Sequence, residues 1–491
     1  MSWSHLQNGS DIRGIALEGI EGESVNLTPE IVRTIGWSFS EWLKEKYNID
    51  NPCISVGNDS RVTASILNKG VSEGIELSGG SVGDCGLSST PAMFMSTILE
   101  NHRFDGAIML TASHLPYNRN GLKFFTCDGG LDKSDITSIL ENAFQKGLLD
   151  PKPLSRTTKV NIMRDYSEYL VTIIREGSGL DDPLSGLNII VDAGNGAGGF
   201  FVESILKPLG ADTTGSQFLD PDGMFPNHIP NPEDQDAMAA IVAAVKKQKA
   251  DFGIIFDTDV DRAGAVDKNG KPINRNRFIA LMATIVLDEY PETTIVTDSV
   301  TSSGLKALIE SLNGKHHRFK RGYKNVINEA IRLNSLGINC ELALETSGHG
   351  ALKENYFLDD GAYQIAKILI KIAKLHNSKS GTIDELISSL EEPLESIEYR
   401  PQITVKDFSE YADNVLEKFV TYVEDKESWN LTPNNFEGVH VTVPGGWILL
   451  RKSLHDPQLP INIECNIKGS SQLIKNQIDN FLMKFEHLKL S

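Results

Sequence analysis

The chain repeats one arrangement of apolar and polar positions: a short apolar run that ends in a polar turn and is followed by helical spacing. Runs of this kind begin at Ile54, Leu187 and Thr294. Each is followed by a second apolar run that leads straight into a polar loop, at 107–110, 253–256 and 341–344. Short apolar runs bounded by turn residues indicate buried strands, and their alternation with helices indicates α/β units. The pattern therefore predicts three α/β domains of one design, each offering a loop at the end of an equivalent strand.

Helical periodicity marks both ends of this region. An amphipathic helix is predicted over 29–44, and another is predicted near 365–375, where apolar residues fall on one face. After a linker at 376–381, a smaller α+β piece follows, with strands near 401–405, 438–443 and 461–467 and helices near 407–424 and 471–486. The predicted domain boundaries are 1–155, 156–268, 269–385 and 395–491.

Composition narrows the class of protein. The 491 residues are 40% hydrophobic and 23% charged, typical of a globular chain of several domains. A net charge of −19 disfavours binding to nucleic acid or to anionic membranes. The 5 cysteines are scattered and form no CxxC pair, which favours a reducing compartment. No apolar stretch approaches the ~20 residues of a membrane span, and no signal peptide is recognisable at the start. We expect a cytoplasmic location.

One polar loop, at 111–123, carries the first candidate chemistry. It follows the apolar run 108–110 and holds Ser113, His114 and Lys123. In open α/β sheets, ligands bind just outside the carboxyl ends of the strands. A serine hydroxyl is a weak nucleophile that needs a nearby base or metal. From these residues alone, an ordinary capping loop rich in turn residues remains an alternative.

A second loop places carboxylates at alternate positions. Asp257, Asp259 and Asp261 follow the apolar strand 254–256, which disfavours a solvated acidic turn. Three carboxylates supply hard oxygen ligands suited to Mg²⁺. An EF-hand is excluded, because Arg262 and Lys268 stand where that loop needs glycine and glutamate.

Three further stretches contain candidate ligand-binding motifs. Residues 345–349 (Glu-Thr-Ser-Gly-His) offer groups that can bind sugar hydroxyls, with a helix N-cap as the alternative. Residues 451–457 (Arg-Lys-Ser-Leu-His-Asp-Pro) could cradle a phosphate or form a solvated basic turn. Residues 194–199 match the G-x-G-x-x-G dinucleotide fingerprint, but a lone match is weak and a packing turn is favoured. No P-loop motif is present, and Ser113 lies in no G-x-S-x-G.

Together these motifs resemble those of the α-D-phosphohexomutases. The resemblance covers Asp-Ile-Arg-Gly at 11–14, the Thr-Ala-Ser-His-x-Pro and Asn-Gly-x-Lys segments at 111–123, and Asp-x-Asp-x-Asp-Arg at 257–262. It continues through the sugar loop, where Leu344 replaces a common glycine, to Arg-x-Ser at 451–453. The phosphate loop departs from the family at Leu454, His455 and Asp456. The resemblance implies three similar α/β domains with mixed sheets plus a smaller α+β C-terminal domain, around a central cleft.

The resemblance also implies a role for each matching residue. Ser113 would be phosphorylated. Catalysis would involve Ser113, His114, Lys123, Arg13 and Arg262. Mg²⁺ would be held by Ser113, Asp257, Asp259 and Asp261. The sugar phosphate would be bound by Glu345, Ser347, His349, Arg321 and Lys324. A phosphate would be bound by Arg451, Ser453 and His455.

The implied activity is a Mg²⁺-dependent phosphohexomutase that interconverts hexose 1-phosphate and hexose 6-phosphate, with glucose first and mannose second. A phosphoserine and a bisphosphorylated sugar would be its intermediates, and hexose 1,6-bisphosphate its activator. Its partners would be small-molecule sugar phosphates. A hexose 1,6-bisphosphate synthase, a phosphoglucosamine mutase and a non-catalytic sugar-phosphate-binding relative are the alternatives.

Overall fold

The computed structural model describes residues 2–453 and 456–490. Its contacts divide the chain into two compact units, one made of residues 1–278 and 347–385 and the other of residues 279–346 and 386–491. The chain passes from the first unit to the second within helix α7 (Arg275–Glu289). Over the described ranges, no helix combines the length and apolar character needed to cross a bilayer. The finer boundaries predicted from the sequence stay predictions.

The first unit opens with a mixed, 8-stranded sheet. Its strand order is β1-β2-β6-β5-β3-β4-β8, with β7 paired to β6. The strands are β1 (Gln7–Asn8), β2 (Asp11–Ile15), β3 (Cys53–Asn58), β4 (Ser81–Leu87), β5 (Gly106–Leu110), β6 (Arg119–Thr126), β7 (Gly129–Gly130) and β8 (Thr157–Lys159). β5, β3, β4 and β8 run parallel to one another, whereas β6 is antiparallel to both β5 and β2. The hairpin between β5 and β6 therefore carries the serine loop out of the parallel core.

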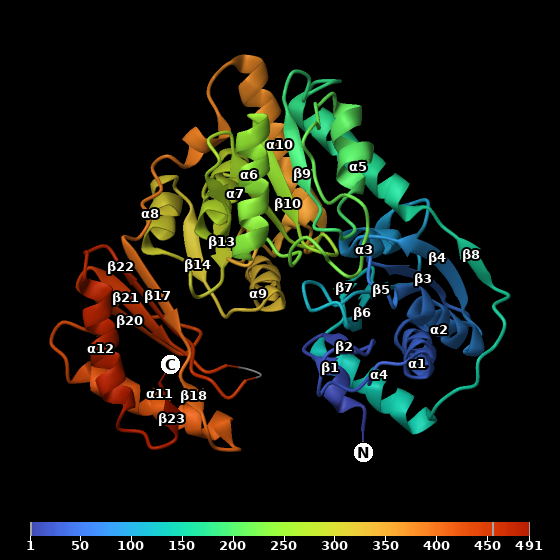
Figure 1. Ribbon diagram of the computed structural model, residues 1–491, viewed down its shortest axis with the longest axis horizontal. Coiled ribbons are helices and arrows are strands. Elements are labelled where there is room, and N and C mark those ends of the chain that lie inside the picture. The colour runs from blue at the N-terminus through green and yellow to red at the C-terminus, as the bar shows by residue number, and fades with distance from the viewer. Residues whose placement is uncertain (1, 454–455, 491) are drawn as a thin grey trace. The chain divides into compact units, whose positions relative to one another are not determined.

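Four helices cover this sheet: α1 (Pro29–Tyr47), α2 (Ala64–Leu77), α3 (Thr90–Ile98) and α4 (Lys133–Lys146). α1 packs against α2 and α4, and α3 packs against β3, β5 and β6. Figure 1 shows α3 on one side of the sheet and α1 and α2 on the other. The predicted helix over 29–44 is confirmed as α1, which Thr28 caps and which Asn48 ends in a left-handed conformation.

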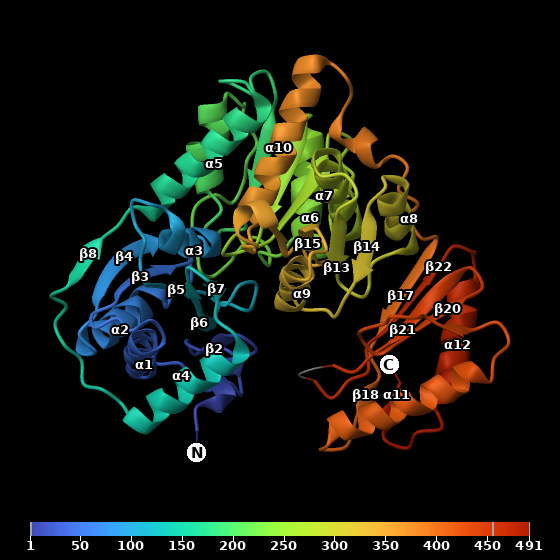
Figure 2. The ribbon, with the colours of Figure 1, turned by 180° about the vertical axis from the view of Figure 1, so that it is seen from behind.

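The rest of the first unit contains a 4-stranded sheet in the order β12-β11-β10-β9. The strands are β9 (Ile189–Asp192), β10 (Phe252–Phe256), β11 (Ala263–Asp267) and β12 (Pro272–Ile273). β9 and β10 are parallel, and β11 is antiparallel to β10. The helices are α5 (Ile162–Ser178), α6 (Gln235–Gln248) and α10 (Gly361–Ser378), and β16 (Gly350–Leu352) precedes α10. α10 lies against α5, as both views show (Figures 1 and 2).

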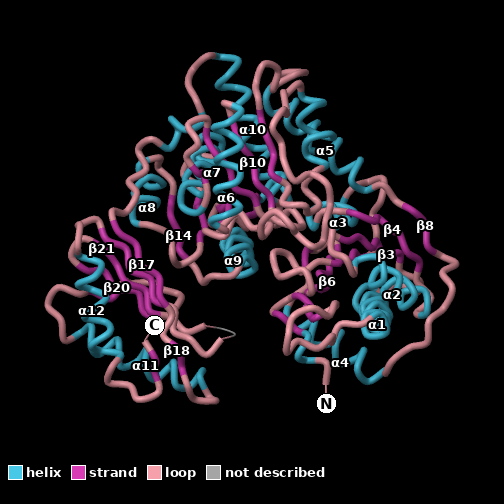
Figure 3. Tube along the Cα trace, in the orientation of Figure 1, coloured by secondary structure: helices cyan, strands magenta, loops and turns pink. Residues whose placement is uncertain are grey.

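The second unit begins with three parallel strands in the order β14-β13-β15. They are β13 (Thr294–Thr297), β14 (Lys315–Arg318) and β15 (Cys340–Leu344), with α8 (Ser303–Ser311) and α9 (Tyr323–Ser335) between them. Figure 3 shows strand β14 between helices α8 and α9. Short helical segments elsewhere in the chain lie at Ser4–Leu6, Val202–Leu206, Lys207–Leu209, Lys353–Asn355 and Ile383–Ile387.

The C-terminal part of the second unit is an antiparallel sheet in the order β17-β22-β21-β20-β19, with a separate β18–β23 pair. The strands are β17 (Glu395–Tyr399), β18 (Gln402–Ile403), β19 (Asn430–Leu431), β20 (Val439–Val443), β21 (Gly446–Leu450), β22 (Ile461–Cys465) and β23 (Leu488–Lys489), and the helices are α11 (Phe408–Glu424) and α12 (Ser470–Leu482). Three α/β segments followed by a smaller α+β segment confirm the predicted fold class.

Candidate functional site

Ser113 lies on the loop between β5 and β6, in a strained backbone conformation. Its φ is 49°, a left-handed value that is uncommon for a residue with a side chain. Its amide donates to Thr111 Oγ1 at 2.9 Å, and its hydroxyl donates to Asp257 Oδ2 at 3.0 Å. The loop leads into strand β6 and caps no helix, so the capping alternative is wrong. The hydroxyl is buried and aimed at the carboxylate loop.

Arg262 and His114 surround the same hydroxyl. Arg262 Nη2 donates to Ser113 Oγ at 3.1 Å and to Asp257 Oδ2 at 3.1 Å, and it lies 2.6 Å from His114 Nδ1. Burial, reinforced by the charges of Arg262 and Arg13, lowers the pKa of His114 to about 3. The imidazole is therefore neutral near pH 7, and its Nδ1 can accept the Arg262 hydrogen bond.

The three aspartates between β10 and β11 form a buried triad. One carboxylate oxygen from each of Asp257, Asp259 and Asp261 lies within 4.8 Å of the others, and all three residues are at most 1% exposed. This burial rules out a solvated acidic turn. Lys123 Nζ donates to Asp259 Oδ2 at 2.9 Å and also to Asp261 Oδ2. The Oδ1 atoms of Asp259 and Asp261 are buried and accept no hydrogen bond from the described residues. Such orphaned oxygens fit the ligand set of a hard divalent cation.

The pKa values of Asp257 and Asp261 are shifted in opposite directions. Burial and the neighbouring carboxylates of Asp261 and Asp259 raise the pKa of Asp257 well above its usual value. Burial opposes the charge of Asp261 as well, but Lys123, His349 and Arg262 together lower its pKa. Crowded carboxylates therefore disfavour full ionisation of the triad in the absence of a cation.

The N-terminus of α3 contacts the triad. Thr90 Oγ1 donates to Asp259 Oδ2 at 2.5 Å, and the Thr90 amide donates to the Asp259 carbonyl at 2.8 Å. Lys123 donates to the same Oδ2 atom, and Oδ1 of Asp259 has no hydrogen-bond donor among the residues that the structure describes. The positive end of the helix dipole also favours a carboxylate at this position. Thr90 was not predicted as a site residue.

His349 joins the triad through a second carboxylate. His349 Nδ1 lies 2.6 Å from Asp359 Oδ2 and 3.8 Å from Asp261 Oδ1. Burial disfavours the imidazolium, but Asp359 and Asp261 outweigh it and raise the pKa of His349 to about 9. Residues 346–348 lead into β16 and begin no helix, so the N-cap alternative is wrong there. Ser347 lies in this turn, two residues before His349.

Arg13 lies on β2, the strand beside β6. It pairs in register with Gly121 and forms an ion pair with Asp11 Oδ2 at 3.1 Å. The first unit thus brings Ser113, His114, Lys123, Arg262, the aspartate triad and His349 into one cluster, with Arg13 on the adjoining strand.

The second unit holds the remaining predicted sugar-binding residues. Glu345 Oε1 accepts the Gly322 amide at 2.6 Å, and Arg321 Nε lies 3.7 Å from Asp298 Oδ2. Lys324 lies in the first turn of α9. The structure therefore brings the loop after β15 next to the start of α9. Both segments lie at the carboxyl edge of the parallel strands.

The predicted phosphate loop follows β21. Arg451 is 8% exposed, which rules out a solvated basic turn at this residue. Its Nη1 lies 3.9 Å from Glu437 Oε1, while Glu437 Oε2 accepts the Arg321 amide at 3.2 Å and the Ser299 hydroxyl. Ser453 Oγ accepts the Asp456 amide at 3.2 Å. His455 lies outside the described residues.

Sequence reasoning missed Thr90, Asp359 and Glu437. The Ser-Thr-Pro sequence at 89–91 is typical of a helix start and gave no sign that the helix faces the triad. Asp359 and Glu437 lie 10 residues from His349 and 14 from Arg451, and only the fold brings each pair together.

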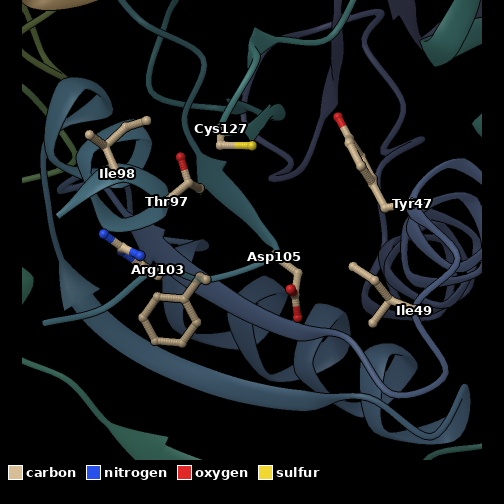
Figure 4. A pocket seen from close by; sticks show the side chains of 8 residues that line it. Tyr47, Ile49, Thr97, Ile98, Arg103, Asp105 and Cys127 are labelled. Atoms are coloured by element: carbon tan, nitrogen blue, oxygen red, sulfur yellow. The ribbon is translucent and has the colours of Figure 1, made fainter. Parts of the chain in front are cut away.

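Two other features play no part in this cluster. The glycine-rich turn after β9 packs closely against the aspartate loop. A Cβ on Gly196 would lie only 2.6 Å from the Thr258 carbonyl oxygen, so this close approach requires glycine. A pocket of about 380 Å³ near Tyr47, Arg103 and Asp105 contains none of the predicted site residues (Figure 4). Its acidic group, Asp105, accepts the Cys53 amide at 2.7 Å and so supports the sheet.

Comparison with known proteins identifies the family. Models of the phosphoglucomutase/phosphomannomutase α/β/α domains I, II and III match residues 5–149, 165–270 and 274–392. A phosphoglucomutase/phosphomannomutase of Thermococcus kodakarensis is 30% identical and aligns over 92% of each chain. A phosphomannomutase/phosphoglucomutase of Pseudomonas syringae is 28% identical over 95% of this chain and 92% of its own.

A solved structure extends the likeness to the whole fold. A phosphoglucomutase/phosphomannomutase family protein from Burkholderia thailandensis superposes with a TM-score of 0.80 at 25% identity, covering 99% of this chain and 98% of its own. The motif order, the fold and these relatives agree. The chain belongs to the phosphoglucomutase/phosphomannomutase family of α-D-phosphohexomutases.

Proposed function

We propose that this chain is a Mg²⁺-dependent phosphohexomutase that interconverts hexose 1-phosphate and hexose 6-phosphate, with glucose first and mannose second. The observation that carries the proposal is the buried Ser113 hydroxyl, 3.0 Å from Asp257 of the triad and 3.1 Å from Arg262. A hydroxyl held between a cation site and a guanidinium is suited to carry a phosphoryl group.

The triad and the phosphoserine define the first half of the reaction. Phosphorylated Ser113 would donate its phosphoryl group to the free hydroxyl of a bound hexose monophosphate. The P–Oγ bond would break and a P–O bond to the sugar oxygen would form, while the proton of the sugar hydroxyl would be transferred to the departing Ser113 Oγ. Arg262 would stabilise the charge that develops on the phosphoryl oxygens. Mg²⁺ on the three aspartates and Ser113 would supply further positive charge at the same oxygens.

The second half returns the other phosphate to Ser113 after the hexose 1,6-bisphosphate turns end for end. Lys123, which contacts Asp259 and Asp261, would assist proton transfer or stabilise charge. His114 would assist as a neutral acceptor beside Arg262. Free hexose 1,6-bisphosphate would activate the enzyme by phosphorylating Ser113.

Substrate recognition is assigned to the other predicted residues. Glu345 and Ser347 would bind the 3- and 4-hydroxyls, with His349, Arg321 and Lys324 completing the sugar-phosphate site. Arg13 would contribute to the catalytic group. Arg451 and Ser453, with His455, would hold the phosphate that does not react. Contacts to the 3- and 4-hydroxyls would not discriminate between the two configurations at the 2-position of the sugar, which supports acceptance of both glucose and mannose phosphates.

The test combines activity with mass spectrometry. The purified protein should convert glucose 1-phosphate to glucose 6-phosphate in the presence of Mg²⁺ and a trace of glucose 1,6-bisphosphate. Intact mass and a peptide map should place one phosphate on Ser113, and Ser113→Ala should abolish both signals. Full turnover by Ser113→Ala, or phosphate on another residue, would overturn the proposal.

A second candidate is a hexose 1,6-bisphosphate synthase. It is favoured by the altered phosphate loop, with Leu454, His455 and Asp456, and by the Glu437 carboxylate that faces Arg451. A weakly held distal phosphate would let the bisphosphate leave before it reorients. Incubation with glucose 6-phosphate and fructose 1,6-bisphosphate separates the two activities. Accumulation of glucose 1,6-bisphosphate in place of glucose 1-phosphate would support the synthase.

A further inference from the structure

A buried arginine outside the predicted site binds the backbone of the serine loop. Arg61 follows β3, and its side chain is 0% exposed. Its guanidinium donates to four carbonyl oxygens of the segment 113–119. Nη1 donates to Pro116 O at 2.7 Å and to Arg119 O at 2.9 Å, while Nη2 donates to Leu115 O at 2.7 Å and to Ser113 O.

The surroundings of Arg61 fix its orientation. Its Nε lies 3.3 Å from Asp59 Oδ2, and its own amide donates to Asp59 Oδ1 at 3.0 Å. The Phe225 ring centre lies 5.2 Å from its Cζ. A buried guanidinium is costly unless it is paired and hydrogen-bonded, and this one is both. The planar fork therefore works as a rigid template for the loop carbonyls.

This template acts on the strained residue itself. Ser113 has a φ of 49°, a conformation that costs on the order of 1–3 kcal/mol and persists only where its surroundings enforce it. Thr111 holds the amide of Ser113 and Arg61 holds its carbonyl. The two peptide groups that set the direction of the side chain are thus both restrained, and the hydroxyl is directed at Asp257 and Arg262.

We propose that Arg61 is a positioning residue for the phosphoryl-carrying serine, an inference that rests on the proposed function. It binds neither substrate nor metal in this scheme. By gathering four carbonyls it fixes the curvature of the loop and keeps Ser113 Oγ in line for phosphoryl transfer. Small misplacements of a reacting atom are costly, since much of enzymatic phosphoryl transfer depends on positioning.

The substitution Arg61→Lys tests this geometry without removing the charge. An ammonium presents its three donors from one point and cannot reproduce the planar fork across four carbonyls. The matched control is Arg33→Lys. Arg33 is also a buried arginine of the first unit, paired with Glu73 at 2.7 Å and donating to the Leu149 carbonyl at 3.0 Å. Neither of these partners, within the part of the chain that the structure describes, belongs to the serine loop. Both variants are compared with wild type as full-length, phosphorylated protein.

Three measurements separate positioning from general stability. For Arg61→Lys we expect kcat to fall by at least tenfold while KM for glucose 1-phosphate changes by less than threefold. We also expect faster amide hydrogen exchange confined to the loop 111–121. Arg33→Lys should keep wild-type kcat per folded molecule and wild-type exchange in that loop. In Arg61→Ala, added guanidinium should restore part of the lost kcat.

Contrary outcomes are equally specific. Wild-type kcat and wild-type loop exchange in Arg61→Lys would overturn the inference, as would equal loop exchange in both lysine variants. A fall in kcat without any change in loop exchange would also overturn it. The exchange experiment does not depend on turnover, so an inactive wild-type protein would refute the proposed function while the effect of Arg61 on the loop could still be measured.

Discussion

Replacing Thr90 by valine removes one hydroxyl from the surroundings of the triad and leaves the side-chain shape almost unchanged. The lost contact is the 2.5 Å hydrogen bond to Asp259 Oδ2. A hydrogen bond to a charged group contributes about 1.5–3 kcal/mol, which corresponds to roughly a 10- to 150-fold change in an equilibrium constant. Lys123 still donates to the same oxygen, which reduces the loss. We therefore expect the half-saturating Mg²⁺ concentration to rise by about 10- to 100-fold, in line with outer-shell substitutions at metal sites.

The assay is a Mg²⁺ titration of mutase activity, supported by direct Mn²⁺ binding followed by electron paramagnetic resonance. Thr97→Val is the matched control, since Thr97 is a buried residue of the same helix whose hydroxyl donates to the Phe94 carbonyl at 2.8 Å. Thr90→Ser should recover most of the affinity. If Thr90→Val shifts the metal dependence by less than twofold, or no more than Thr97→Val does, Thr90 does not orient the triad.

The other predictions concern charge. Lys123→Met should destabilise the metal-free protein by about 3–5 kcal/mol, because buried carboxylates lose their partner, and Mg²⁺ should raise its melting temperature more than that of wild type. Glu437→Gln should lower KM for glucose 1-phosphate about fivefold, the equivalent of roughly 1 kcal/mol; an unchanged KM would show that this carboxylate does not compete with phosphate. Burial disfavours the charge of His228, but Asp192 outweighs it and raises the pKa. The His228–Asp192 pair should thus stabilise the fold below pH about 6.5 and lose this effect as pH rises through the raised pKa of His228. Unfolding curves of Asp192→Asn should show no such loss. Calorimetry should find tighter Mg²⁺ binding when Ser113 is phosphorylated than after phosphatase treatment.

Local pattern was sufficient to predict the strands and loops that present the site. The runs before Thr111 and Asp257 became β5 and β10, because short apolar stretches bounded by turn residues have few other ways to be buried. In the C-terminal part, the pattern missed β17 and β21. β17 has an alternating pattern of partly exposed residues, and β21 follows β20 after a two-residue turn; neither lies within a strand predicted from the sequence.

Contacts between distant segments could not be predicted. Arg61 lies in the turn after β3, 52 residues before Ser113, and Thr90 lies 169 residues before Asp259. Each sequence neighbourhood is ordinary: a turn after a strand and the start of a helix. Motifs indicate the residues that perform chemistry because the chemistry fixes their type and spacing. The residues that orient them are fixed only by topology, through β3 beside β5 and α3 above the same sheet.

The charges around the triad can now be counted for the metal-free protein. Three carboxylates are buried beside two cations, Lys123 and Arg262. With all three carboxylates ionised, one negative charge is in excess, while the His349–Asp359 pair balances itself. Burial and the neighbouring carboxylates raise the pKa of Asp257 well above the ordinary range, so this excess negative charge is unfavourable in the absence of a cation.

This charge count predicts that a cation at the triad and a phosphoryl group on Ser113 depend on each other. Mg²⁺ would add two positive charges, and with three ionised carboxylates the buried site would then hold about one excess positive charge. A phosphoryl group on Ser113 carries roughly −1.5 to −2 and would bring the site back near neutrality. In a poorly solvated site, uncompensated charge is expensive, so each of the two ligands lowers the cost of binding the other. The acidic triad and the serine, which the sequence places 144 residues apart, are therefore parts of one electrostatic unit.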